Sequence, residues 1–530
     1  MKTYRFSGLP LFLALGLTMG ACTDNFKDYN TNPNEATEEM LSYDNLLVGG
    51  FVPQMQMDVI PVSDKGANDY QRAQCLTGDI FSGYMAAIGV WNGSSNNSTY
   101  NLSFGGWNDA AFSVGFTKVM PAWKQIHDKA EEVTPTTYAL AQVLKVATMH
   151  RLTDNYGPLP YFNFGHGGLT TPYDSQEEIY KSFFKDLDAA IEVLEDFAIK
   201  NPAARPLRKF DLVYGGDYGK WVKFANSLKL RLAMRISYVE PELARRYAEE
   251  AVNHSRGVFT QNTDNALLQS ANGIIVYNPL KVVWDAYSDT RMGANMESFL
   301  KGYGDARLSK YFNASKKDGE YHGVRTGIVI GDKSKYEPLS TPNIEANKPV
   351  QWMVAAEVYF LRAEGALRGW DMGDTAEELY NQGIRTSHAQ WDAVLPGAYL
   401  KDEASVAASY EDPVASNHIR TGDNRLSTIT IKWNNSDSFE KNLERIITQK
   451  WLSVYPDGQE AWSEFRRTGY PKIFPVAVNN SGGTISTEKQ IRRIPFPISE
   501  YNNNKAEVRK AVSLLNGPDN GGTNLWWDKK

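Results

Sequence analysis

The strongest constraint on the fold is a helical pattern of apolar residues that recurs in pairs along the chain. In residues 179–194, Ile179, Phe183 and Leu187 fall on one face with a period of 3.6 residues, and charged residues occupy the other faces. The preceding residues 138–152 are rich in alanine and apolar on nearly every side, as expected of a helix that its neighbours cover. We therefore predict two packed helices, joined by a long loop rich in Gly and Pro.

The same helix–loop–helix pattern returns later in the chain. The second helices share apolar or small residues at positions i, i+4 and i+7, which are Tyr180/Phe184/Leu187, Ala244/Ala248/Ala251 and Ala376/Tyr380/Gly383. Small residues let helices approach closely, and this spacing is typical of the second half of a tetratricopeptide unit. Because the spacing between copies is irregular, ordinary amphipathic helices remain an alternative. We predict a mainly α fold on a scaffold of about four tetratricopeptide-like pairs, near residues 138–196, 220–253, 354–387 and 439–471.

Three stretches between the predicted helices have little periodicity and many turn-forming residues, namely 83–112, 256–350 and 392–438. The second contains two short runs with high β propensity, 273–277 and 327–331. We predict a loop-rich face, irregular or with short strands, built against the helices. Loops carry function more often than the helices that support them.

The first residues have the pattern of an exported, lipid-anchored protein. Lys2 and Arg5 precede an apolar run that is too short to span a membrane, and small residues come just before Cys22. We predict a signal peptide over 1–21, a lipidated Cys22, a flexible acidic spacer over 22–40 and one domain over 41–530. A plain signal peptide with an incidental cysteine is the alternative. Only one other cysteine exists, so an acylated Cys22 leaves no disulfide.

Composition and motifs argue against several classes of function. The net charge is −6 and the chain has no basic block, so nucleic-acid binding is not expected. The seven histidines form no zinc-binding pair, and the sequence lacks GxSxG, GxxxxGK[ST] and DxDxDG motifs. We therefore assign no catalytic residue, no metal ligand and no cofactor. A glycosidase needs two carboxylates that only the fold can bring together, so that class stays open.

Several stretches resemble the SusD/RagB-like surface lipoproteins. They span the chain in order, and their positions are 24–34, 153–162, 220–237, 356–370, 448–471, 492–504 and 525–530. The resemblance implies a tetratricopeptide-like scaffold and an anchor in the outer membrane, facing outwards. It also implies that the protein binds an oligosaccharide, or a peptide, and acts as a lid that delivers it to a SusC-like TonB-dependent transporter. A structural calcium ion is compatible with the family, although the sequence does not indicate one.

Ligand-binding residues do not carry over from the family by motif, so we choose candidates by chemistry. Aromatic rings stack on the apolar faces of sugars, and amide or guanidinium groups reach the hydroxyls. The candidates lie in loop-rich stretches and are Trp91, Asn92, Trp107, Asn108, Trp284, Tyr287 and Arg291. The alternative for each ring is packing within the loops or against the transporter. At the level of the whole protein, the alternatives are a lipid-anchored glycoside hydrolase and a tetratricopeptide adaptor without a small ligand.

Overall fold

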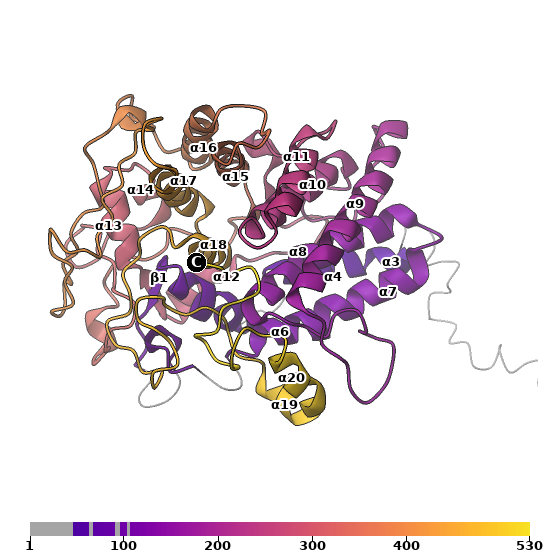
Figure 1. Ribbon diagram of the computed structural model, residues 1–530, viewed down its shortest axis with the longest axis horizontal. Coiled ribbons are helices and arrows are strands. Elements are labelled where there is room, and N and C mark those ends of the chain that lie inside the picture. The colour runs from indigo at the N-terminus through magenta and orange to yellow at the C-terminus, as the bar shows by residue number, and fades with distance from the viewer. Residues whose placement is uncertain (1–45, 63–66, 91–95, 103–106) are drawn as a thin grey trace, which may run out of the picture. The chain divides into compact units, whose positions relative to one another are not determined.

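Four pairs of consecutive helices form the scaffold of the computed structural model, which describes residues 46–62, 67–90, 96–102 and 107–530 (Figure 1). The pairs are α8 (Pro135–Tyr156) with α9 (Gln176–Lys200), α10 (Tyr218–Arg235) with α11 (Pro241–Asn253), α15 (Ala355–Leu367) with α16 (Ala376–Gln390), and α17 (Phe439–Val454) with α18 (Gly458–Thr468). The pairs also contact one another, because α9 packs on α10, α10 on α15, and α15 on α17. The predicted mainly helical scaffold of paired helices is confirmed. Val48–Lys530 form one compact unit.

Helix α9 illustrates why these segments are helical. The Ser175 hydroxyl accepts a hydrogen bond from the Glu178 main-chain nitrogen at 3.2 Å, and the Glu178 carboxylate accepts one from the Ser175 nitrogen at 3.2 Å. This reciprocal cap satisfies two of the donors that a helix start leaves free. The stripe that includes Phe183 and Leu187 is buried against α8 and α10. Burial of each such side chain contributes roughly 1.5–3 kcal/mol.

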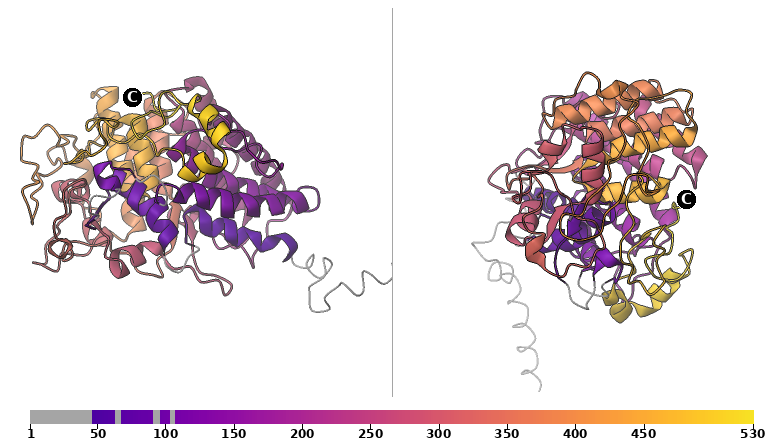
Figure 2. Two further views of the ribbon diagram at one scale, coloured as in Figure 1. Left: turned by 90° about the horizontal axis from the view of Figure 1, so that it is seen from below. Right: turned by 90° about the vertical axis from the view of Figure 1, so that its left-hand side faces the viewer.

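Small residues bring the helices of a pair close together, as the spacing in the sequence predicts. In α11, Ala244, Ala248 and Ala251 are fully buried, and this helix packs on α10. In α16, a Cβ atom on Gly383 would lie 2.7 Å from the Phe360 ring of α15, which is shorter than any normal contact. The right-hand view of Figure 2 shows the orange helices of this region side by side.

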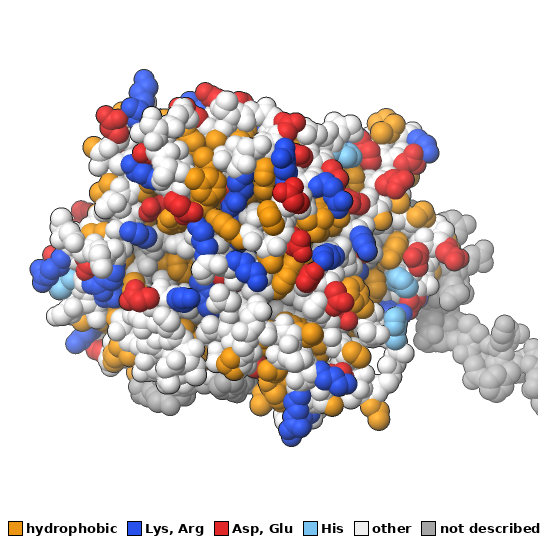
Figure 3. Space-filling model, viewed as in Figure 1, with side chains coloured by type: hydrophobic (Ala, Val, Ile, Leu, Met, Phe, Trp, Pro, Cys, Tyr) orange, Lys and Arg blue, Asp and Glu red, His pale blue; other side chains and the backbone are white. Residues whose placement is uncertain are grey.

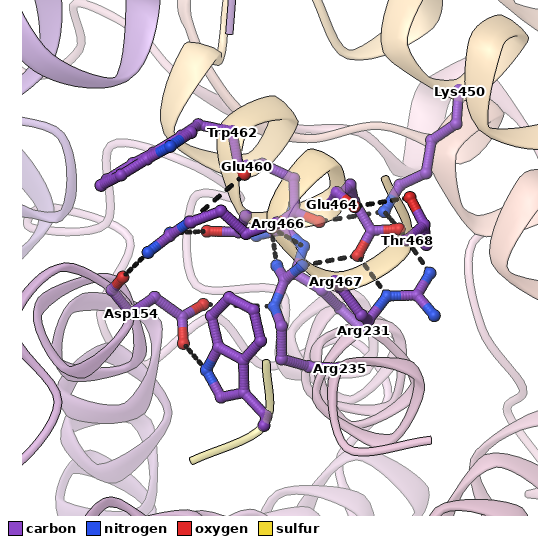
Figure 4. A network of polar contacts seen from close by, with 12 residues as sticks. Asp154, Arg231, Arg235, Lys450, Glu460, Trp462, Glu464, Arg466, Arg467 and Thr468 are labelled. Carbon is purple, nitrogen blue, oxygen red and sulfur yellow. Dashed lines mark hydrogen bonds and ion pairs between the residues drawn. The ribbon is translucent and has the colours of Figure 1, made fainter. Parts of the chain in front are cut away.

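Helix α18 is buried along its whole length although many of its residues are charged. Glu460 and Glu464 form ion pairs with Arg235 of α10 and Lys450 of α17 (Figure 4). Arg467 pairs with Glu364 of α15. A buried charge is costly unless it is paired and hydrogen-bonded. The network therefore holds α18 in one position among the three other helices.

The loop-rich stretches contain short strands that form two small antiparallel sheets. Strand β1 (Met85–Ala87) pairs with β3 (Thr290–Met292), with Ala86 opposite Arg291. Strand β2 (Ala266–Leu268) pairs with β4 (Val350–Met353). The β-prone runs 273–277 and 327–331 do not form strands. The backbone turns with positive φ at Gly273 and Gly327, so neither run stays extended beside a partner.

The remaining elements connect the scaffold to these sheets or follow it. They are α3 (Leu46–Gly49), α4 (Phe51–Val59), α5 (Asn68–Tyr70), η2 (Gln71–Asp79), η3 (Asn97–Thr99), α6 (Ala110–Val114), η4 (Gly115–Val119), α7 (Met120–Ala130), η5 (Asn262–Asp264), α12 (Pro279–Lys281), η6 (Val282–Ala286), α13 (Ala294–Gly302), α14 (Leu308–Tyr311), η7 (Lys333–Lys335), η8 (Tyr399–Lys401), α19 (Ile498–Asn503) and α20 (Lys505–Val512). Within the described residues, no helix combines the length and hydrophobicity that a membrane span requires.

Candidate functional site

A groove in the loop-rich part of the protein brings together two of the predicted ligand-binding residues, Trp284 and Arg291. We call it the Trp284 groove, and its volume is about 610 Å³. Its other polar lining residues include Ser288, Asn313, Lys316 and Glu337. An aromatic ring among convergent polar groups is the common composition of a small-molecule site.

Trp284 is held in place on η6 by its indole nitrogen and by a cation. The Nε1 atom donates a hydrogen bond to the main-chain oxygen of Ile344 at 3.0 Å. The Nζ atom of Lys281 lies 4.1 Å from the ring centroid, a distance that permits a cation–π contact. Lys281 is itself positioned by Asp285 at 3.2 Å and Glu345 at 3.3 Å. The ring is only half-buried, so part of it faces solvent in the groove.

Arg291 lies on β3 and is buried, with 3% of its surface exposed. Its Nε and Nη2 atoms donate to the main-chain oxygen of Glu337 at 3.0 and 2.8 Å, and Nη2 also donates to the Ser288 hydroxyl at 2.8 Å. Nη1 donates to the main-chain oxygens of Thr290 at 2.7 Å and Trp284 at 3.4 Å. Burial lowers the pKa of Arg291 to about 10. Main-chain oxygens and Ser288 therefore accept the hydrogen bonds of this guanidinium, and its contact with ligand hydroxyls stays a prediction.

Tyr287 does not line the Trp284 groove. Its hydroxyl donates to the Asn68 side chain at 3.4 Å, and its main-chain oxygen accepts a hydrogen bond from Lys333 at 3.1 Å. The structure therefore separates Tyr287 from Trp284, although only two residues lie between them in the sequence.

Asn108 is also held by contacts within the protein. It is buried, with 4% exposed, and its amide exchanges hydrogen bonds with the amide of Asn97 at 2.9 and 3.3 Å. Its main-chain oxygen accepts a hydrogen bond from the Tyr156 hydroxyl at 2.5 Å. These contacts fix the loop that contains Asn97, and a role of the Asn108 amide in ligand binding stays a prediction. The neighbouring Trp107 is half-buried in the turn before α6, and it does not line the Trp284 groove.

Three predicted positions lie outside the described residues. They are Trp91, Asn92 and the lipidated Cys22. Their roles stay predictions from the sequence.

Several groove residues were not predicted from the sequence. Asn313, Lys316 and Glu337 lie in polar runs without tryptophan, whereas the prediction looked for aromatic rings beside amides. The available signal was the density of Asn, Ser and Lys within the long insertion 256–350. Across the described part of the chain, His, Cys, Asp and Glu side chains form no group of three that could hold a metal ion.

Comparison with known proteins places this geometry in a family. Residues 28–528 match the model of the SusD-like family, described as Susd and RagB outer membrane lipoprotein. No curated protein matches the chain. Many solved structures do, and each of the three described below covers 91% of this chain.

The first is a chitin-binding SusD homolog from Flavobacterium johnsoniae, with 43% identity, a TM-score of 0.86 and 99% of its own chain covered. A SusD homolog from Bacteroides uniformis has 41% identity, a TM-score of 0.83 and 99% coverage. A SusD-like protein from Bacteroides thetaiotaomicron has 36% identity, a TM-score of 0.85 and 99% coverage. The chain therefore belongs to the SusD-like family of outer membrane lipoproteins.

Proposed function

We propose that this protein binds an oligosaccharide in the Trp284 groove and delivers it to a SusC-like TonB-dependent transporter. The observation that carries the binding step is the half-buried Trp284 ring in a groove of about 610 Å³ with polar walls. A fixed aromatic face stacks on the apolar face of a sugar ring, while amide, hydroxyl and ammonium groups bond its hydroxyls.

The family and its members support a saccharide as the ligand. A relative with 43% identity is described as chitin-binding, which makes oligomers of N-acetylglucosamine the first ligands to test. Fold alone does not determine function, so the proposal depends on the groove and its residues. A peptide ligand would use the same polar walls and is the second ligand class to test.

Calorimetric titration with neutral oligosaccharides tests the binding site. We expect wild-type protein to bind at least one of them and Trp284→Ala to lose most of that affinity. Trp370→Ala is the matched control, since Trp370 is also half-buried but lies outside the groove. Equal affinities of the two variants would contradict the assignment of the Trp284 groove.

The same titrations separate the proposal from its alternatives. A lipid-anchored glycoside hydrolase would release reducing sugar from the bound oligosaccharide, whereas the proposed binding protein returns it intact. A tetratricopeptide adaptor would bind neither oligosaccharide nor peptide. Either result would replace the proposed function.

Delivery to a transporter needs the protein at the membrane. We propose that Cys22 carries the lipid anchor and that the protein faces outwards, as expected for a lipoprotein of this family. The protein, extracted in mild detergent, should purify together with a large outer-membrane barrel. Cys22→Ser should move it to the soluble fraction, and a Cys22→Ser protein that remains membrane-bound would contradict the anchor.

A further inference from the structure

A second groove, separate from the Trp284 groove, lies between α18, the loop around residue 424 and the last residues of the chain. We call it the basic groove, and its volume is about 340 Å³. Its lining includes six cationic side chains and one acidic side chain, that of Glu488. The cations are Arg425, Arg466, Lys472, Lys489, Arg492 and Lys530. Figure 3 shows Lys and Arg side chains gathered around the place where Figure 1 marks the C-terminus.

Only some of these cations are neutralised. Arg425 pairs with Asp423 at 2.5 Å, Lys530 pairs with Glu440 at 2.9 Å, and Arg492 pairs with Asp528. Lys472 and Lys489 are exposed, and neither forms an ion pair with any residue that the structure describes. The groove therefore presents two ammonium groups that are free to meet an anion.

The buried wall of the groove adds to the positive potential. Arg466 is fully buried, and its guanidinium donates to main-chain oxygens of Asp154 at 2.6 Å and Arg492 at 2.9 Å. It forms no ion pair with a described carboxylate, and burial lowers its pKa to about 9. Nearby, Arg325 is 7% exposed and donates to the oxygen of Pro475, another lining residue, at 3.3 Å. The Nε atom of Arg325 has no partner among the described residues. Asp154 and Asp528 act on Arg466, and Asp423 and Asp412 act on Arg325, but none of them lies within ion-pair distance and the pKa of each guanidinium stays lowered. These carboxylates offset only part of the cost of burying the two charges, and a nearby anion would offset more of it.

The basic groove continues into a cavity with a different lining. This cavity has a volume of about 730 Å³ and shares Asn424 and Lys472 with the basic groove. Hydroxyl side chains line it, among them Ser409, Thr421, Ser427 and Thr428. Hydroxyl and amide groups suit the hydroxyls of a saccharide, whereas the cations suit an acidic substituent.

We propose that the basic groove and the adjoining hydroxyl-lined cavity form a second ligand site, which binds a saccharide through an acidic substituent, a carboxylate or a sulfate. The acidic substituent meets Lys472 and Lys489, and the neutral part of the chain extends past Asn424 toward the serines and threonines. This site is independent of the neutral saccharide proposed for the Trp284 groove.

Titration of the whole protein with three tetrasaccharides tests this second site. The first probe is chondroitin 4-sulfate, which carries both sulfate and carboxylate groups. The second is unsulfated chondroitin, which carries carboxylate groups alone, and the third is chitotetraose, which has no acidic group. We expect the acidic probes to bind to the wild-type protein. The double variant Lys472→Gln/Lys489→Gln should bind them about tenfold more weakly, because each lost charge-assisted hydrogen bond weakens binding several-fold. Lys505→Gln/Arg509→Gln is the matched control, because it removes two exposed charges of α20 outside the groove.

Each other outcome overturns the proposal. Equal weakening in both double variants means that only the net charge matters. Loss of acidic-probe binding in Trp284→Ala, or competition by chitotetraose, places the acidic probe in the Trp284 groove. If neither acidic probe binds to the wild-type protein, the second site is rejected, whatever the result with chitotetraose.

Discussion

Arg291 donates two hydrogen bonds to one main-chain oxygen, that of Glu337, at 3.0 and 2.8 Å. The same guanidinium reaches the main-chain oxygen of Trp284 at 3.4 Å. Trp284 and Glu337 line the groove from segments about fifty residues apart in the sequence. Arg291 is therefore a positioning residue that links two walls of the Trp284 groove.

Replacement of Arg291 by lysine should lower both stability and affinity. One ammonium group cannot reproduce the planar fork of donors, so we expect the free energy of unfolding to fall by about 2 kcal/mol. Saccharide binding should weaken as well, because the walls lose their link. Chemical denaturation and calorimetric titration of Arg291→Lys measure the two effects.

Arg362 offers a matched control for this substitution. It donates its Nε and Nη2 atoms to the main-chain oxygen of Met372 at 2.9 and 2.8 Å, and it lies on α15 outside the groove. Arg362→Lys should lose similar stability and keep its affinity. If Arg291→Lys loses affinity without losing stability, Arg291 contacts the ligand directly, as the sequence first suggested.

The scaffold could be predicted from the sequence because its signals are local. The stripe of α9 and the small residues of α16 are visible within about twenty residues of sequence. Helix α18 could be located but its burial could not be predicted. Its Glu464 is neutralised by Arg235, which is 229 residues away, and no local pattern reveals that pairing.

In the candidate site, too, the sequence alone does not show which single side chains are free to bind a ligand. Trp284 could be chosen because an aromatic ring in a loop-rich insertion offers a face on which a sugar can stack. Arg291 and Asn108 have equally suitable chemistry, but a main-chain oxygen and the Asn97 amide accept their hydrogen bonds. Which polar groups are already satisfied depends on the three-dimensional arrangement, which single-sequence patterns do not contain.

Loss of a single cation from the buried network around α18 should lower the free energy of unfolding strongly. Arg235→Met would leave Glu460, Glu464 and Asp154 without one of their partners inside the core. Removal of one member of a buried pair typically costs about 3–5 kcal/mol, and we expect that loss in urea denaturation. Arg245→Met is the control, because its pair with Glu249 is exposed at the surface, and it should leave the denaturation midpoint unchanged. Equal midpoints for both variants would show that the network is not stabilising.

His150 predicts a specific pH dependence of stability. Burial, together with Arg231 of α10 and Arg151, lowers the pKa of His150 to about 3, although Glu460 opposes the shift. An unfolded histidine has a pKa near 6.5 and binds a proton that the folded state excludes. This residue therefore destabilises the fold progressively as the pH falls from about 6.5 to about 3, with a slope of about 1.4 kcal/mol per pH unit.

His150→Gln should remove this contribution, so the unfolding free energy should depend less steeply on pH in that window. Denaturant titrations at several pH values between 4 and 7 measure the slope. The exposed His166 provides the comparison, and His166→Gln should keep the wild-type slope. An unchanged slope in His150→Gln would mean that His150 binds a proton as readily in the folded state as in the unfolded state.

The close contact between α15 and α16 predicts that a normally stabilising substitution will be harmful. In a helix interior, alanine is more stable than glycine by about 1 kcal/mol. At position 383 the new methyl group would meet the buried Phe360 ring at 2.7 Å, and displacement of that ring costs about 1–3 kcal/mol. We expect Gly383→Ala to lower the thermal midpoint, while Gly397→Ala, in an exposed loop with no atom within 4 Å, should leave it unchanged. A higher midpoint in Gly383→Ala would show that the helices can separate at this point without cost.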